Sequence, residues 1–126
     1  YTKEYVEGLL KRLSDLGPSK VVLTGVSFKE GEVGAASYDK ATNEISYAFT
    51  KRTPGSYHGT GDLFGSAFVA AIVRGISINK SIKIAVDLVK SSTEITYKRG
   101  TPTNYGVDFE SRLQQFSIDI QNNINK

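Results

Sequence analysis

The sequence predicts an α/β fold, with about four helices packed against a sheet that combines parallel pairing with an antiparallel hairpin. The first observation is a helical pattern over residues 2–16, followed at 21–25 by a short apolar run. The second is a pair of strand-like runs at 32–38 and 44–50, separated by a polar turn. Helical patterns dominate the rest of the chain, and its length suits a single domain, so we expect residues 1–126 to belong to one domain.

The first helix is predicted from apolar positions that recur at helical spacing, namely Tyr5, Leu9, Leu13 and Leu16, with Val6 and Leu10 widening the stripe. Gly17 and Pro18 end it. The run at 21–25 is rich in β-branched residues, as in a strand that is buried on both faces. A helix, a tight turn and a buried strand favour a parallel sheet.

The two following runs form a hairpin, because the polar segment 39–43 is a suitable turn between them. A polar loop with one proline and one glycine covers residues 51–58. A helix is then predicted over 62–74, where no charged residue occurs between Asp62 and Arg74. A helix that is apolar on all sides is normally buried.

Two more helices complete the prediction. The first begins near Ser77 or Asn79 and continues to about Ile95, with a core stripe of Ile82, Ala85, Val86 and Val89. Residues 101–106 are irregular, and an amphipathic helix spans roughly residues 109–124.

Composition excludes several kinds of chemistry. The chain has no cysteine, which excludes disulfides and thiolate catalysis, and its single histidine, His58, makes a zinc site untenable. No apolar run approaches the roughly 20 residues of a membrane span, so we expect no membrane partner. The net charge of +3 comes from scattered lysines and arginines, which does not favour a nucleic-acid partner.

The segment Gly59-Thr60-Gly61-Asp62 is the strongest candidate for a functional motif. It precedes the predicted apolar helix, and a helix N-terminus offers unpaired N–H groups and a partial positive charge to an anion. Glycines on both sides of Thr60 allow close approach to that anion. The simpler interpretation is a loop that ends in a helix cap. The Walker and dinucleotide-binding fingerprints fit less well, because their glycine spacings differ.

The order of these features resembles the C-terminal half of a ribokinase-like kinase. The features are a strand ending at Thr24 and Gly25, a hairpin, a basic loop, the motif at 59–62 with its apolar helix, a second helix, and Tyr105-Gly-Val-Asp-Phe-Glu110 before the last helix. Within that superfamily the sequence is most similar to bacterial pyridoxal and pyridoxamine kinases. The resemblance implies an enzyme that transfers phosphate from ATP to the hydroxymethyl group of a vitamin B6 vitamer.

The resemblance also implies roles for individual residues. Asp62 matches the catalytic base of the family, and Gly59, Thr60 and Gly61 match its anion hole. Thr24 and Gly25 match residues near the nucleotide, and the loop that closes over ATP is matched by Thr50, Lys51, Arg52 and Thr53. The helix around 86–90 is expected near the adenine. Lys51 and Arg52 have an alternative interpretation as charges on a solvated loop.

Two other functions stay open on this evidence: a hydroxymethylpyrimidine kinase of thiamine synthesis, and a non-catalytic module that binds a nucleotide or phosphate. The chain opens at Tyr1 and contains no methionine, so we expect a fragment. In the resembled family the absent N-terminal half carries most of the vitamer pocket and the acidic groups that organise magnesium. We therefore expect no metal ligands in this chain, little activity of the chain alone, an exposed sheet edge and apolar surface, a homodimer, and a cytoplasmic location.

Overall fold

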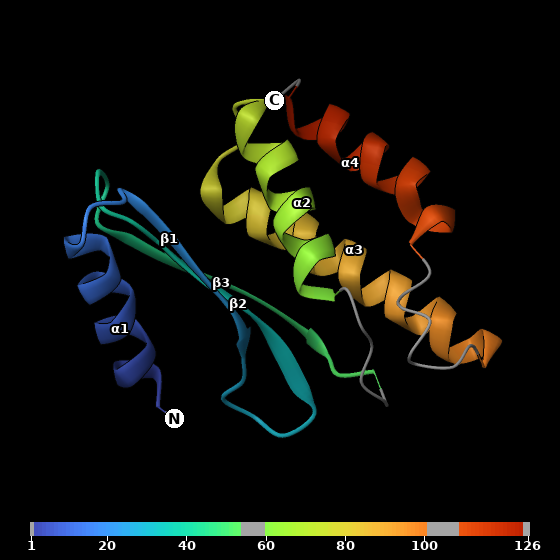
Figure 1. Ribbon diagram of the computed structural model, residues 1–126, viewed down its shortest axis with the longest axis horizontal. Coiled ribbons are helices and arrows are strands. Elements are labelled where there is room, and N and C mark those ends of the chain that lie inside the picture. The colour runs from blue at the N-terminus through green and yellow to red at the C-terminus, as the bar shows by residue number, and fades with distance from the viewer. Residues whose placement is uncertain (1, 54–59, 101–108, 125–126) are drawn as a thin grey trace.

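The structure, a computed structural model, describes residues 2–53, 60–100 and 109–124 and has three layers (Figure 1). A sheet lies between one helix on one face and a helical layer on the other. The elements, in chain order, are α1 (Lys3–Asp15), β1 (Lys20–Val26), β2 (Glu32–Asp39), β3 (Glu44–Lys51), α2 (Thr60–Val73), α3 (Ile78–Arg99), the short 3₁₀ helix η2 (Glu110–Arg112) and α4 (Leu113–Ile124). The α/β class and the four helices are confirmed.

The sheet has the order β1-β2-β3, and both pairs of neighbours are antiparallel. The hairpin of β2 and β3 is therefore confirmed, whereas the parallel pairing expected for the first strand does not occur among the described strands. The connection between Val26 and Glu32 is too short for a crossover, which needs a dozen or more residues. Within the described residues, β1 pairs with β2 alone and leaves its other edge without a partner strand.

The apolar run in β1 is buried because helices cover both faces of the sheet. Val21 packs with α1, whereas Val22 packs with the core beneath α2 and α3. An antiparallel strand in a sheet that is covered on both faces therefore has the same apolar pattern as a buried parallel strand. This coincidence explains why the sequence favoured a parallel pairing that does not occur among the described strands.

Helix α1 packs on the sheet through Val6 and Leu10, which meet Val21, Ala36 and Tyr38. Its N-cap is Thr2, whose hydroxyl accepts a hydrogen bond from the Tyr5 N–H at 3.2 Å. The predicted stripe was too wide, because the side chains of Tyr5 and Leu16 are exposed. Val6 and Leu10, which the sequence placed at the edge of the stripe, form its centre.

On the opposite face, α2 and α3 pack together against the middle of the sheet. Phe64 and Ala67 of α2 share a core with Ala35 of β2 and with Ile82 and Ala85 of α3. The small residues of α2 allow this close packing. A second cluster, Ala71, Ile76, Ile84 and Ile120, joins α4 to the same pair of helices.

Helix α2 differs from its prediction in two ways. It begins at Thr60 rather than near Asp62, so Thr60, Gly61 and Asp62 of the predicted motif lie in its first turn. It is also not buried all round, because Val69 is 56% exposed and Val73 is 74% exposed. Both valines lie on a face that no described element covers. In the described part of the chain, no helix has the length and apolar character needed to cross a membrane.

Candidate functional site

A cleft of about 330 Å³ lies where β1 and β3 end, β2 starts and α2 begins. Its volume falls at the lower end of the range for small-molecule pockets. Strand ends, a helix start and one face of α3 all contribute to its wall. The lining residues are Thr24, Gly25, Val33, Gly34, Thr50, Lys51, Arg52, Thr53, Thr60, Gly61, Phe64, Val86, Val89, Lys90 and Thr93.

The cleft brings together most of the residues that the sequence singled out. Thr24 and Gly25 come from β1, the segment 50–53 from the end of β3, and Thr60 and Gly61 from the start of α2. Gly59, like His58, lies outside the described residues. Asp62 lies in the first turn of α2 with an exposed side chain, and it is not among the residues that line the cleft.

The start of α2 supplies main-chain donors to the cleft. The first N–H groups of a helix have no carbonyl partner within that helix, and they carry the positive end of its dipole. Gly61 occupies the second position of α2, and a Cβ built there would meet no other atom within 4 Å. Thr60 and Gly61 line the cleft, and an anion is the group that amides at a helix start suit.

The end of β1 is shaped by a bulge at Gly25. The register of β1 against β2 shifts between Thr24 and Val26, and Gly25 has a φ angle of +69°. That left-handed conformation is favourable for glycine and strained for other residues. The bulge ends regular pairing just where Thr24 and Gly25 form the cleft wall.

Gly34 of β2 forms another part of the wall and leaves no room for a side chain. A Cβ at this position would lie 1.8 Å from the carbonyl oxygen of Ala48 in β3. The glycine thus allows β2 and β3 to approach closely beside the cleft. Sequence reasoning did not single out Gly34, because a lone glycine in a strand indicates close approach without saying to what.

Contacts from two sides hold the segment that follows β3. The Arg52 N–H donates to the Gly31 carbonyl at 2.7 Å. From α3, the Lys90 ammonium group donates to the Lys51 carbonyl at 2.6 Å and to the Thr53 hydroxyl at 3.1 Å. Sequence reasoning placed the 86–90 helix near the nucleotide but missed this contact, and it missed Thr93 altogether.

Charge in the cleft is of one sign. Among the described residues that line it, Lys51, Arg52 and Lys90 are cations and none is an acid. A concave surface with charge of one sign concentrates ligands of the opposite sign. Beside this cationic rim, Phe64, Val86 and Val89 form an apolar wall that suits a flat ring. The cleft therefore combines cationic side chains with an apolar surface.

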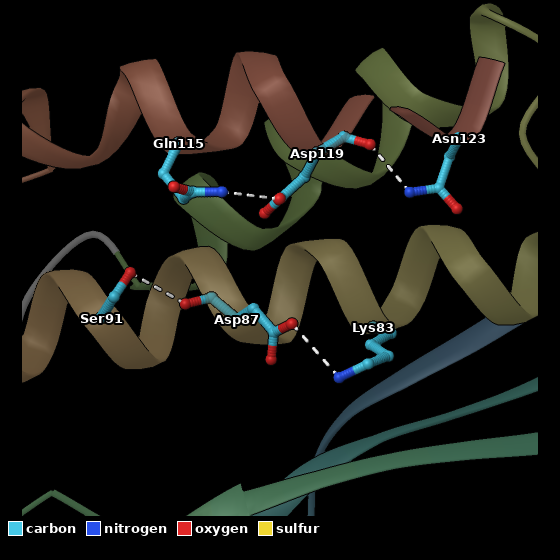
Figure 2. A network of polar contacts seen from close by, with 6 residues as sticks. All are labelled: Lys83, Asp87, Ser91, Gln115, Asp119 and Asn123. Carbon is cyan, nitrogen blue, oxygen red and sulfur yellow. Dashed lines mark hydrogen bonds and ion pairs between the residues drawn. The ribbon is translucent and has the colours of Figure 1, made fainter. Parts of the chain in front are cut away.

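Elsewhere among the described residues, the polar groups do not assemble into a second site of this kind. Figure 2 shows Lys83, Asp87 and Ser91 linked along α3, and a separate ladder of Gln115, Asp119 and Asn123 linked along α4. These are contacts between residues four apart within one helix, which stabilise helices modestly. A hollow of about 570 Å³ between β3 and the start of α3 is lined by Val86 and Asp87 of the 86–90 segment and by none of the other predicted site residues.

A magnesium site is not evident in the residues that the structure describes. They contain no group of three or more histidine, aspartate or glutamate side chains placed to hold a metal ion. The cation that accompanies ATP does not fit these residues alone. The expectation that its ligands lie elsewhere in the protein stays a prediction.

Comparison with known proteins gives one family match. A sequence model described as phosphomethylpyrimidine kinase matches residues 1–106, which include every predicted site residue. No curated protein matches the sequence.

Several solved structures share the fold. A Bacteroides thetaiotaomicron protein assigned as a phosphomethylpyrimidine kinase superposes with a TM-score of 0.88 at 24% identity, covering 93% of this chain and 40% of its own. A crystal form of that protein with pyridoxal superposes with a TM-score of 0.80 at 22% identity, and the match covers 96% of this chain and 42% of that one. Pyridoxal kinase from Lactobacillus plantarum superposes with a TM-score of 0.78 at 24% identity, and the match covers 88% of this chain and 40% of that one. The chain thus spans about two fifths of the length of these structures.

Proposed function

This chain belongs to the phosphomethylpyrimidine kinase family, and we propose that the intact protein transfers the γ-phosphoryl group of ATP to the hydroxymethyl group of a vitamin B6 vitamer. The resemblance to pyridoxal and hydroxymethylpyrimidine kinases is confirmed by the family match and by the shared fold. One observation carries the proposal. The start of α2, the bulge of β1 and the cationic end of β3 are distant in sequence, yet they line a single cleft.

The anion hole is the first element of the proposed mechanism. Phosphoryl transfer passes through a loose transition state, so catalysis depends mainly on positioning and on stabilising charge. We assign charge stabilisation to the N–H groups of Gly59, Thr60 and Gly61. Those of Thr60 and Gly61 belong to the first turn of α2, which orients them before the substrate binds. Lys51 and Arg52, at the rim of the same cleft, hold the other phosphates of ATP.

We assign to Asp62 the task of orienting the hydroxyl group of the acceptor. Its position in the first turn of α2 lies next to the proposed anion hole, and its exposed carboxylate is accessible to a substrate. In a loose transition state the proton leaves late, so the main task of the carboxylate is to aim the hydroxyl in line with the leaving group. Deprotonation of that hydroxyl completes the transfer.

The apolar wall is assigned to the adenine. Val86 and Val89 of α3 line the cleft near Lys90, within the segment expected beside the base. Stacking of a flat ring on branched aliphatic side chains removes apolar surface from water. ATP brings magnesium that neutralises phosphate charge, and we place the ligands of that ion in another part of the protein.

The choice of acceptor rests on the relatives. One related structure is a pyridoxal kinase and another contains pyridoxal, which favours a B6 vitamer. The description of the matching family names a phosphomethylpyrimidine, the phosphate ester that a hydroxymethylpyrimidine kinase of thiamine synthesis forms, and so favours a hydroxymethylpyrimidine acceptor instead. Both classes present a hydroxymethyl group on a nitrogen-containing aromatic ring, so the same transfer chemistry serves either one.

The rest of the site is assigned to a further part of the protein. The related structures are more than twice as long as this chain. We propose that the additional part pairs with the open edge of β1, covers Val69 and Val73 of α2, and supplies most of the acceptor pocket. A homodimer and a cytoplasmic location, where ATP and free vitamers are available, complete the proposal.

The proposal is tested by mixing the intact protein with ATP, magnesium and one candidate acceptor at a time, and by measuring ADP and the phosphate ester. We expect ester formation with pyridoxal, pyridoxamine or pyridoxine. Ester formation with hydroxymethylpyrimidine alone moves the assignment to thiamine synthesis.

One observation favours a non-catalytic module as the second candidate function, because Asp62 does not line the cleft. That function predicts saturable ATP binding without ADP from any acceptor. The same experiment, with ATP binding measured by calorimetry, therefore separates the two functions.

A further inference from the structure

Lys90 makes a long-range contact that its sequence context does not suggest. It lies in α3, and its ammonium group reaches the carbonyl oxygen of Lys51, a residue 39 positions earlier, at 2.6 Å. The same group lies 3.1 Å from the Thr53 hydroxyl. Hydrogen bonds from a charged donor are shorter and stronger than neutral ones. Lys90 therefore fastens the end of β3 to α3.

Thr93, one helical turn further on, completes this contact. Its hydroxyl lies 2.9 Å from the Lys90 carbonyl and 3.3 Å from the Thr53 hydroxyl. One arrangement of hydrogens uses all these contacts: the Lys90 ammonium donates to Thr53, Thr53 donates to Thr93, and Thr93 donates to the Lys90 carbonyl. Thr93 is buried and Lys90 half-buried, so the bonds to the Thr53 hydroxyl are partly shielded from water, whereas the bond to the Lys51 carbonyl is exposed.

The neighbouring lysine on the same helix behaves differently. Lys83 is exposed and pairs with Asp87 at 3.3 Å, four residues along α3 (Figure 2). That pair joins α3 only to itself. Lys90 instead joins α3 to the segment 51–53, which lines the cleft.

We propose that Lys90 is a positioning residue, which together with Thr93 holds the segment 51–53 at the rim of the cleft in the form that binds a nucleotide phosphate. The proposal rests on the proposed function where it identifies the anion as a nucleotide phosphate. Without Lys90, the segment is held through the Arg52 N–H bond to Gly31 and by the pairing of β3 with β2. Binding then has to order a segment that Lys90 otherwise fixes in advance.

The test compares Lys90→Met, which keeps an unbranched stem without the charged donor, with Lys90→Arg, which restores a donor. Lys83→Met is the matched control, because it makes the same change on the same helix away from the cleft. Thr93→Val is a second, independent variant that removes the bridging hydroxyl. Each variant is made in the intact protein, and folding is checked by thermal unfolding.

The first readout is amide hydrogen exchange over residues 50–53 without nucleotide. We expect Lys90→Met to raise the exchange rate of the Arg52 amide about tenfold, the effect of losing one hydrogen bond to a charged group. Thr93→Val gives a smaller increase, Lys90→Arg restores most of the protection, and Lys83→Met leaves it unchanged. Unchanged exchange in both Lys90→Met and Thr93→Val overturns the proposal.

The second readout is kinetic. Lys90→Met is expected to raise the KM for ATP about tenfold and to lower kcat less than threefold, because it weakens ordering before the chemical step. Faster exchange with an unchanged KM overturns the link to nucleotide binding. If the wild-type protein neither binds ATP nor releases ADP, the proposed function fails. The exchange measurement then still decides whether Lys90 holds this segment.

Discussion

Gly34 offers a sharp test of how the cleft is built, through the substitution Gly34→Ala. The added Cβ would lie 1.8 Å from the Ala48 carbonyl oxygen, 2.8 Å from the Ala48 carbonyl carbon and 2.8 Å from the Phe49 Cα. Comfortable contacts between carbon atoms are about 3.5–4.0 Å. All three neighbours are main-chain atoms, so the overlap is relieved only by moving β3 away from β2.

The size of the effect follows from that movement. Overpacking a well-packed site costs about 1–3 kcal/mol, and each ladder hydrogen bond weakened by the displacement costs about 0.5–1.5 kcal/mol. We therefore expect Gly34→Ala to lower the free energy of unfolding by about 3 kcal/mol. The displaced end of β3 carries Thr50 and Lys51, so ATP binding should weaken as well.

Gly8→Ala in α1 is the matched control. A Cβ at Gly8 would meet only the end of the flexible Arg12 side chain, at 3.3 Å. Replacing a glycine inside a helix with alanine stabilises by about 0.5–1 kcal/mol. Both variants restrict the unfolded chain equally, so their difference reports the folded state. Urea unfolding of both proteins is the assay, and a Gly34→Ala variant within about 0.5 kcal/mol of wild type refutes the reasoning.

Three further predictions concern charge, pH and the extent of the chain. Replacing both Lys51 and Arg52 with alanine should weaken ATP binding about tenfold, as measured by calorimetry at low salt. The free energy of unfolding should change by less than about 0.5 kcal/mol, because both side chains are exposed. Unchanged affinity supports the alternative that these are charges on a solvated loop. Burial and the hydrogen bond to Glu7 raise the pKa of the Tyr47 hydroxyl. The resulting stabilisation is complete below the unfolded value of 10.0 and is lost as the pH rises beyond it, so Tyr47→Phe should flatten the alkaline fall in unfolding free energy. Residues 1–126 alone should form no phosphate ester from ATP and any vitamer, and turnover by this chain contradicts the proposal that a further part completes the site.

Local patterns predicted the helices and the hairpin because each depends on nearby residues. The apolar spacing around Leu10, the stop at Gly17 and the polar turn at 39–43 all indicate structure directly. The pairing direction of β1 could not be predicted in this way. Burial on both faces produces the same run of apolar residues in either arrangement.

The candidate site was predicted through resemblance more than through spacing. Thr24, Thr53 and Thr60 are ordinary strand-end, loop and helix-start residues, and only the fold brings them to one cleft. Lys90 was missed as an individual contact because a lysine in an amphipathic helix normally lies on a solvated face. Its partners are distant in sequence, and no local periodicity indicates them.

The central claim is that the start of α2 stabilises the transferred phosphoryl group while Asp62 aims the acceptor hydroxyl. The most direct measurement is the turnover of Asp62→Asn in the intact protein, with the ATP affinity of the same variant measured alongside it. We predict a fall in kcat of at least about a hundredfold, the range of a general-base contribution, with ATP affinity nearly unchanged. An Asp62→Asn enzyme that turns over at the wild-type rate contradicts the claim.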